Sequence, residues 1–152
     1  MDNKVWVYLC SQPLEGELLQ SVRHELESFI SSWQSHGTGL QASYKILYHR
    51  FIYIEVNEAA HQASGCSIDS QLRFIKQLEE KHKISLLNRL LVGYKKEKEV
   101  EVVKVSEIED LIQNGVINMH SCIFNTSVSN VSEFNSHFEV EFHKSWIYIK
   151  TI

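Results

Sequence analysis

The first half of the chain alternates between two hydrophobic periods. A β-branched and aromatic run from Lys4 to Cys10 predicts a buried first strand. Apolar residues then recur at helical spacing, and this single stripe predicts a first helix. The stripe consists of Leu14, Leu18, Val22, Leu26, Phe29, Ile30 and Trp33. Two further runs, residues 40–48 and 51–56, predict strands joined by a tight turn at His49-Arg50.

The second half of the chain predicts another helix, a hairpin and a less regular C-terminal segment. Helical spacing returns at Ile68, Leu72, Ile75 and Leu78, and residues 87–94 and 99–105 have the pattern of a hairpin. Residues 106–109 match a capping box, which predicts a short third helix closed by Gly115. Residues 122–128 and 139–149 have strand character, with a turn of helix expected around residues 132–138.

The predicted order of strand, helix, strand, strand, helix and strand is typical of a ferredoxin-like α+β sandwich, βαββαβ. We expect one α+β domain over residues 1–152, with its core at about residues 4–105. The C-terminal extension, residues 106–152, then adds the short helix and a strand segment to the hairpin. The topology places the start of the second helix near the end of the first helix, far from Cys10. The other sheet face, with Tyr44, Ile46 and Tyr53, is expected to be buried by the C-terminal segment or by a second subunit.

The composition of the chain indicates a soluble globular protein and argues against nucleic-acid-binding and membrane proteins. Hydrophobic residues make up 43% of the chain, charged residues 22%, and the net charge is −4, which is typical of a soluble globular protein. The richest basic run, at residues 95–98, is interrupted by Glu97, so no nucleic-acid partner is expected. We also expect no membrane insertion and a cytoplasmic location, because no secretion signal or long apolar window is present. Three scattered cysteines predict free thiols.

A loop of small residues before the second helix carries the densest candidate chemistry. As an anion pocket with a reactive thiol, it would bind ligand through Ser64, Gly65, Cys66, Ser67 and Ser70. The candidate catalytic set is Cys66 as nucleophile, His36 or His61 as its base, and Asp69. We favour a different interpretation, in which Ser67 caps the helix and Asp69 supports its first turn. Gly65 then permits a bend, and Cys66 packs as a small buried hydrophobe.

Several stretches of the chain carry a family resemblance. They are Val5-Trp6-Val7-Tyr8, Arg50-Phe51-Ile52-Tyr53, residues 63–70 followed by Phe74-Ile75-Lys76-Gln77-Leu78-Glu79, and Ser145-Trp146. They resemble a family of short uncharacterised bacterial proteins, some of which carry the label "ABC transporter ATPase". The resemblance covers most of the chain but implies no activity and no site residues. ATPases of that class need a glycine-rich loop ending in Gly-Lys-Ser/Thr. Because no Gly-Lys pair occurs here, ATP hydrolysis is not expected.

Two classes of function remain open at this point. We favour a non-catalytic binding or assembly module, whose partner is another protein or a second copy of the chain. The alternative is a small ligand-binding protein or thiol enzyme centred on residues 64–70. We expect no cofactor and no metal site, because Cys-x-x-Cys and paired histidines at helical spacing are both absent. Two His/Cys pairs, His120 with Cys122 on one strand face and His61 five positions before Cys66, are not enough to predict a metal site.

Overall fold

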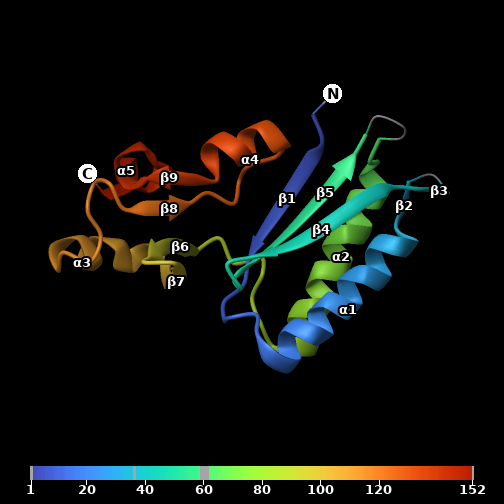
Figure 1. Cartoon of the computed structure of the whole chain (residues 1–152), viewed down its shortest axis with the longest axis horizontal. Helices are drawn as coiled ribbons and strands as arrows, with labels where there is room; N and C mark the ends of the chain where they lie inside the picture. The colour runs from blue at the N-terminus through green and yellow to red at the C-terminus, as the bar shows by residue number, and fades with distance from the viewer. Residues whose placement is uncertain (1, 36, 59–61, 152) are drawn as a thin grey trace.

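The structure is a computed structural model that describes residues 2–35, 37–58 and 62–151 (Figure 1). The described residues form two antiparallel sheets, a short two-stranded ribbon and several helices. One sheet comes from the N-terminal half of the chain and the other from the C-terminal half. The predicted α+β class is confirmed. No helix in these ranges is long and apolar enough to cross a membrane.

The first sheet contains β1 (Lys4–Leu9), β4 (Gln41–Leu47) and β5 (Phe51–Asn57), in the order β1-β5-β4. Two long helices, α1 (Gly16–Ser32) and α2 (Gly65–His82), lie along one face of this sheet (Figure 1). The predicted apolar stripe of the first helix faces the sheet, because residues spaced three and four apart share one side of the helix and are buried together there. The buried residues between the helices and the sheet include Leu14, Val22, Leu26, Ile52, Ile54, Ile75 and Leu78.

Side chains along the first sheet alternate between its two faces. Trp6 and Tyr8 of β1 pack on the helix side, whereas Val5, Val7 and Leu9 point to the other side. The same alternation corrects one expectation. Tyr44 and Ile46 face the helices, while Tyr53 lies on the opposite face, so these three residues do not form one uncovered surface. Side chains alternate between the two faces within β4 and within β5. The turn between these strands determines which residues of β5 share a face with Tyr44 and Ile46, and Tyr53 is not one of them.

The turn between β4 and β5 contains two residues in the left-handed region, Tyr48 at φ 53° and His49 at φ 56°. It therefore lies one residue before the predicted position at His49-Arg50. Arg50 follows the turn as a buried side chain, and its Nη2 donates to the carbonyl oxygens of Cys10 at 3.3 Å and Ser11 at 3.1 Å. These bonds tie the turn to the end of β1. The short ribbon of β2 (Gln34–Ser35) and β3 (Thr38–Gly39) links α1 to β4.

The second sheet has the strand order β7-β6-β8-β9. Its strands are β6 (Leu91–Lys96), β7 (Glu99–Lys104), β8 (Cys122–Phe124) and β9 (Glu139–Glu141). The short helices of this half are α3 (Ile108–Gln113), α4 (Val131–His137) and α5 (Trp146–Thr151), with 3₁₀ turns at Val105–Glu107 and Phe142–Lys144. The predicted hairpin and the predicted turn of helix near residue 135 are both present.

A shared core joins the two halves of the chain. Val5, Val7, Leu9, Phe51 and Tyr53 from the first sheet pack with Val100, Phe124, Val128 and Phe138 from the second half. Gly93 of β6 permits this close approach, because a Cβ there would lie 3.0 Å from Val100 Cγ1 and 3.3 Å from Phe51 Cζ. A further core on the other side of the second sheet includes Val92, Ile108, Ile123, Phe142 and Ile147. The C-terminal half therefore covers the sheet face that the helices leave open.

The predicted ferredoxin-like arrangement is not confirmed. In that arrangement the strand after the second helix would add to the first sheet, but β6 pairs with β7 and β8 in the second sheet. Val92, Gly93 and Tyr94 of β6 are all buried. Val92 and Tyr94 pack within the C-terminal half, whereas Gly93 lies against Phe51 of the first sheet, so β6 packs onto the first sheet instead of extending it. As a result, β1 remains at the edge of the first sheet.

The C-terminal elements differ from their predictions in detail. The expected capping box at residues 106–109 does not form, because residues 105–107 make a 3₁₀ turn whose cap lacks a side-chain bond. Gly115 does end the third helix, at φ 74°, and its N–H donates to the Ile112 carbonyl. The strands expected over residues 122–128 and 139–149 shorten to β8 and β9, and α5 occupies the end of the second range.

Candidate functional site

The loop before α2 serves mainly to begin the helix. Ser64 is the N-cap, and its Oγ accepts a hydrogen bond from the Ser67 N–H at 3.1 Å. In return, Ser67 Oγ accepts from the Ser64 N–H at 2.7 Å. Ser64 is therefore the cap rather than Ser67, and Asp69 lies beyond the first turn. The sequence has serine at both positions of this reciprocal pair, and only the backbone angles distinguish the cap from its partner.

Cys66 is exposed, which corrects the expectation that it packs as a buried hydrophobe. Its position as the second residue of α2 turns it away from the sheet. Asp69 is exposed as well, and Ser70 Oγ donates to the Cys66 carbonyl at 3.1 Å. His36 and His61 lie outside the described residues. The candidate catalytic set is therefore not assembled among the residues that the structure describes.

The start of α2 does lie beside the end of α1, as the topology predicts. Trp33 follows α1 directly, and its Nε1 donates to the Ser67 carbonyl at 2.8 Å. The three thiols are free: Cys10 is buried, Cys66 is exposed and Cys122 is partly buried. Burial raises the pKa of the Cys122 thiol to about 11, and the neighbouring Glu139 carboxylate adds to this effect. Cys122 is consequently a neutral thiol near pH 7.

The outer edge of β1 provides a site that the sequence analysis did not identify. The N–H of Cys10 donates to the Arg50 carbonyl, so the main-chain N–H and C=O groups of the even-numbered residues of β1 form the hydrogen bonds to β5. The main-chain groups of Val5, Val7 and Leu9 therefore point to the open edge. Val5 is paired there, because its N–H donates to the Ser129 carbonyl at 3.0 Å. Ser11 is also paired, through its N–H and the Ser85 carbonyl at 3.0 Å.

Val7 and Leu9 lie between these two paired positions. Within the described ranges, neither residue has a main-chain partner on the outer side of β1. The alternation of an antiparallel strand thus leaves a short stretch of unpaired N–H and C=O groups in the middle of the edge. The main-chain bonds from the neighbouring segments, at Ser129 and Ser85, lie only at the two ends of this stretch.

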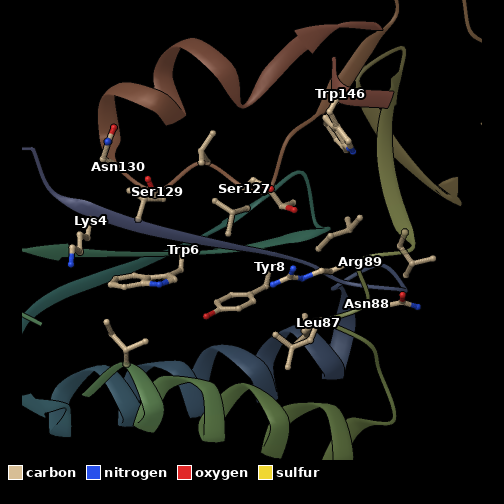
Figure 2. Close-up of a pocket in the computed structure, with 18 of the residues that line it drawn as sticks. Lys4, Trp6, Tyr8, Leu87, Asn88, Arg89, Ser127, Ser129, Asn130 and Trp146 are labelled. Carbon is tan, nitrogen blue, oxygen red and sulfur yellow. The ribbon is translucent and has the colours of Figure 1, made fainter. Parts of the chain in front are cut away.

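A groove of about 980 Å³ lies along this unpaired stretch. Trp6 and Tyr8 stand on the helix side of β1, whereas Ser127, Ser129 and Trp146 stand on the other side (Figure 2). Most of the groove's large side chains are apolar or aromatic: Trp6, Tyr8, Leu86, Leu87, Leu91, Val128 and Trp146. Such a lining is typical of binding sites for apolar groups.

Charged groups occur at both ends of the groove. Lys4 forms an ion pair with Glu58 at 3.8 Å, and Asp2 accepts from the Ser132 N–H at 3.1 Å. Arg89 is exposed and has no ionic or hydrogen-bond partner in the described part of the chain. Its side chain extends along β1 toward the Tyr8 ring (Figure 2). Arg89 is therefore available to a negatively charged group in the groove.

Tyr8 gives the floor of the groove a fixed polar contact. Its hydroxyl donates to Gln71 Oε1 of α2, and Gln71 is itself buried. Burial raises the pKa of Tyr8 well above its usual value, so the phenol stays protonated at neutral pH. The ring is thus held as an apolar surface toward the groove. This arrangement suits binding, because a neutral phenol whose O–H is already engaged in a hydrogen bond to Gln71 offers little acid or base chemistry.

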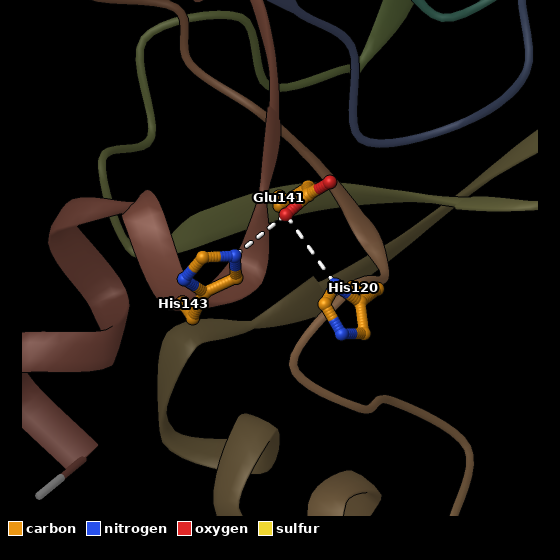
Figure 3. Close-up of side chains that lie close together, drawn as sticks. All are labelled: His120, Glu141 and His143. Atoms are coloured by element: carbon orange, nitrogen blue, oxygen red, sulfur yellow. Dashed lines mark hydrogen bonds and ion pairs between the residues drawn. The ribbon is translucent and has the colours of Figure 1, made fainter.

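A second cluster joins His120, Glu141 and His143 on the second sheet (Figure 3). Glu141 Oε2 lies 2.6 Å from His143 Nε2 and 3.4 Å from His120 Nδ1. Hydrogen bonds from His143 and then His120 hold the pKa of the Glu141 carboxyl below its usual value. Cys122 does not join this cluster, because its Sγ lies 3.8 Å from Glu139. His120 therefore lies beside a residue of β9 and a residue of the turn after it rather than beside Cys122.

Comparisons of the chain with protein-family models, with curated proteins and with solved structures each found no match.

Proposed function

We propose that the protein is a non-catalytic binding module that accepts an extended segment of a partner protein along the outer edge of β1. The observation that carries this proposal is the unpaired main chain of Val7 and Leu9 beside the groove. An exposed edge of this kind is a template for one more strand, whose main chain would supply the missing hydrogen bonds. The added strand would lie next to β1, in the position that the ferredoxin-like arrangement assigns to its last strand.

The groove favours a short segment. From Val5 to Ser11 the strand spans six steps of about 3.4 Å each, or roughly 20 Å. Five residues, 6–10, lie between the two paired positions, so a bound segment of about five residues would fit beside them. Its side chains would alternate between the wall with Tyr8 and the wall with Trp146, so we expect apolar residues at alternate positions. Arg89 favours an acidic group, or a terminal carboxylate, at the nearby end.

A free polypeptide segment fits this edge better than a second copy of the chain. Residues 85 and 129 bond to β1 on each side of the open stretch. In a symmetric pair, both copies would bring these flanking segments to the same edge, where they would collide. An extended peptide has no such flanks and can enter between them.

The alternative, a ligand or thiol site at residues 64–70, has weaker support. The hydroxyls of Ser64 and Ser67 already form the hydrogen bonds that begin α2, and the Ser70 hydroxyl donates to the Cys66 carbonyl within the helix. Cys66 is exposed, but it does not line the groove described above. The residues in this loop thus have a structural role that accounts for most of their polarity.

A selection from a phage-displayed library of random linear dodecapeptides tests the proposal. We expect the full chain to select extended peptides with alternating apolar residues. Synthetic copies, measured by fluorescence anisotropy, should bind Trp146→Ala and Arg89→Ala at least about tenfold more weakly, because large aromatic and arginine contacts dominate such interfaces. The matched control is Leu90→Ala, since Leu90 is 70% exposed beside Arg89 but does not line the groove.

Leu90→Ala should bind the same peptides within about twofold of the parent chain. The proposal is wrong if no linear peptide is selected. It is equally wrong if the selected peptides bind Trp146→Ala and Arg89→Ala as tightly as the parent chain, because they would then use another surface. Circular dichroism of each variant checks that the fold is retained.

A further inference from the structure

The turn that carries His120 is fixed by its own side chains. Asn118 Oδ1 accepts from the His120 N–H at 2.8 Å, and Ser121 Oγ accepts from the Asn118 N–H at 2.9 Å. The Ser121 N–H in turn donates to the Asn118 carbonyl at 3.1 Å. These bonds hold residues 118–121 in one conformation just before β8. The exposed His120 side chain therefore projects from a rigid turn.

The other two side chains of the cluster come from β9 and the turn after it. Cys122 of β8 pairs directly with Glu141 of β9, which places the Glu141 carboxylate beside the His120 turn. Two main-chain bonds then clamp the following residues to that turn: Phe142 N–H to the Ser121 carbonyl at 2.8 Å, and His143 N–H to the Met119 carbonyl at 3.1 Å. Phe142 is fully buried below them. These main-chain bonds thus fix the backbone positions from which the three side chains project.

The nitrogen and oxygen atoms of this cluster converge on one point. Nδ1 of His120, Oε2 of Glu141 and Nε2 of His143 all lie within 4.8 Å of one another (Figure 3). Around a tetrahedral zinc ion, ligand atoms about 2.0–2.1 Å from the metal lie roughly 3.3 Å apart. The two separations from Glu141 Oε2, 2.6 and 3.4 Å, lie on either side of that value, and the two histidine nitrogens lie within 4.8 Å of each other. Small rotations of side chains on a fixed backbone would therefore suffice to place one ion between them.

We propose that His120, Glu141 and His143 bind one divalent transition-metal ion of the zinc class. Two imidazoles and one carboxylate are a ligand set that suits zinc and its first-row neighbours, and three protein ligands leave positions for water. The His120 side chain is 78% exposed, so the remaining positions face solvent. The ion would link the turn before β8 to the turn before α5. This inference does not depend on the function proposed for the groove.

Zinc titration of the full chain tests the site. After treatment with EDTA and its removal, we expect isothermal titration calorimetry with Zn²⁺ to show one site with a Kd below about 100 μM. Each of His120→Gln, Glu141→Gln and His143→Gln should weaken zinc binding by at least about tenfold. The matched control is His137→Gln, because His137 is an exposed histidine of the same half that lies outside the cluster. It should bind zinc within about twofold of the parent chain.

Two results would overturn the metal site. One is a parent chain that binds Zn²⁺ more weakly than about 100 μM. The other is zinc binding that survives in all three cluster variants, which would place the ion elsewhere. Circular dichroism without metal checks the fold of each variant. Because the three cluster residues are replaced one at a time, the test remains decisive if one of the variants fails to fold. The visible absorption of bound Co²⁺ gives the coordination number independently.

Discussion

Replacing Phe124 by alanine is expected to lower the free energy of unfolding by about 3–5 kcal/mol. Phe124 of β8 is 1% exposed, and its ring lies 5.0 Å from that of Phe51 and 5.2 Å from that of Phe138. These rings belong to the core that joins the two halves of the chain. The truncated side chain would leave a cavity between the halves, because Phe51 is held by β5 and cannot move to fill it.

Urea unfolding followed by circular dichroism measures this loss. Leu90→Ala is the control, because Leu90 is largely exposed, and we expect it to change stability by less than about 0.5 kcal/mol. A loss below about 1 kcal/mol for Phe124→Ala would contradict the account. It would mean that the two halves do not share a packed interior.

Replacing Val7 by proline should weaken peptide binding by more than about 100-fold. Proline removes the outward N–H of Val7 and places a ring at the open edge, so an added strand loses a hydrogen bond and meets a steric block. The ladder to β5 should remain, because Val7 contributes no main-chain bond on that side. The measurement is anisotropy with the peptides selected on the parent chain.

Two controls separate the backbone effect from other effects of this substitution. Val7→Ala loses the buried side chain but keeps the N–H, so it should bind peptide within about fivefold of the parent chain. Ala42→Pro places proline at an outward position on the other edge of the sheet, in β4, and should leave peptide binding unchanged. A folded Val7→Pro protein that retains the parent affinity would rule out strand addition at β1.

Elements with a strong local signal were predictable from the sequence. The apolar stripe of α1 is set by a period of 3.6 residues, and the β6–β7 hairpin by two short strand patterns around a polar tip. Gly115 ends α3 as predicted, because few other residues accept its positive φ. Each of these features depends on residues close together in the chain.

Long-range pairing was not predictable in the same way. The pattern of β6 fits either sheet, and its partner β8 lies about 30 residues further along the chain. The groove is assembled from β1, the segment after α2 and the segment before α4, so no local pattern marks it. The same holds for His120 and His143, which come together only because β8 pairs with β9. Cys66 was expected inside because cysteine is commonly buried, but its place on the first turn of α2 decides its exposure.

Residue-resolved amide hydrogen exchange tests the open edge of β1 most directly. In the free chain, we expect the N–H groups of Val7 and Leu9 to exchange at least about 100-fold faster than those of Trp6 and Tyr8, which bond to β5. A saturating selected peptide should slow Val7 and Leu9 specifically. Equal protection of all four amides in the free chain would contradict the account, since β1 would then already have a partner along its outer edge.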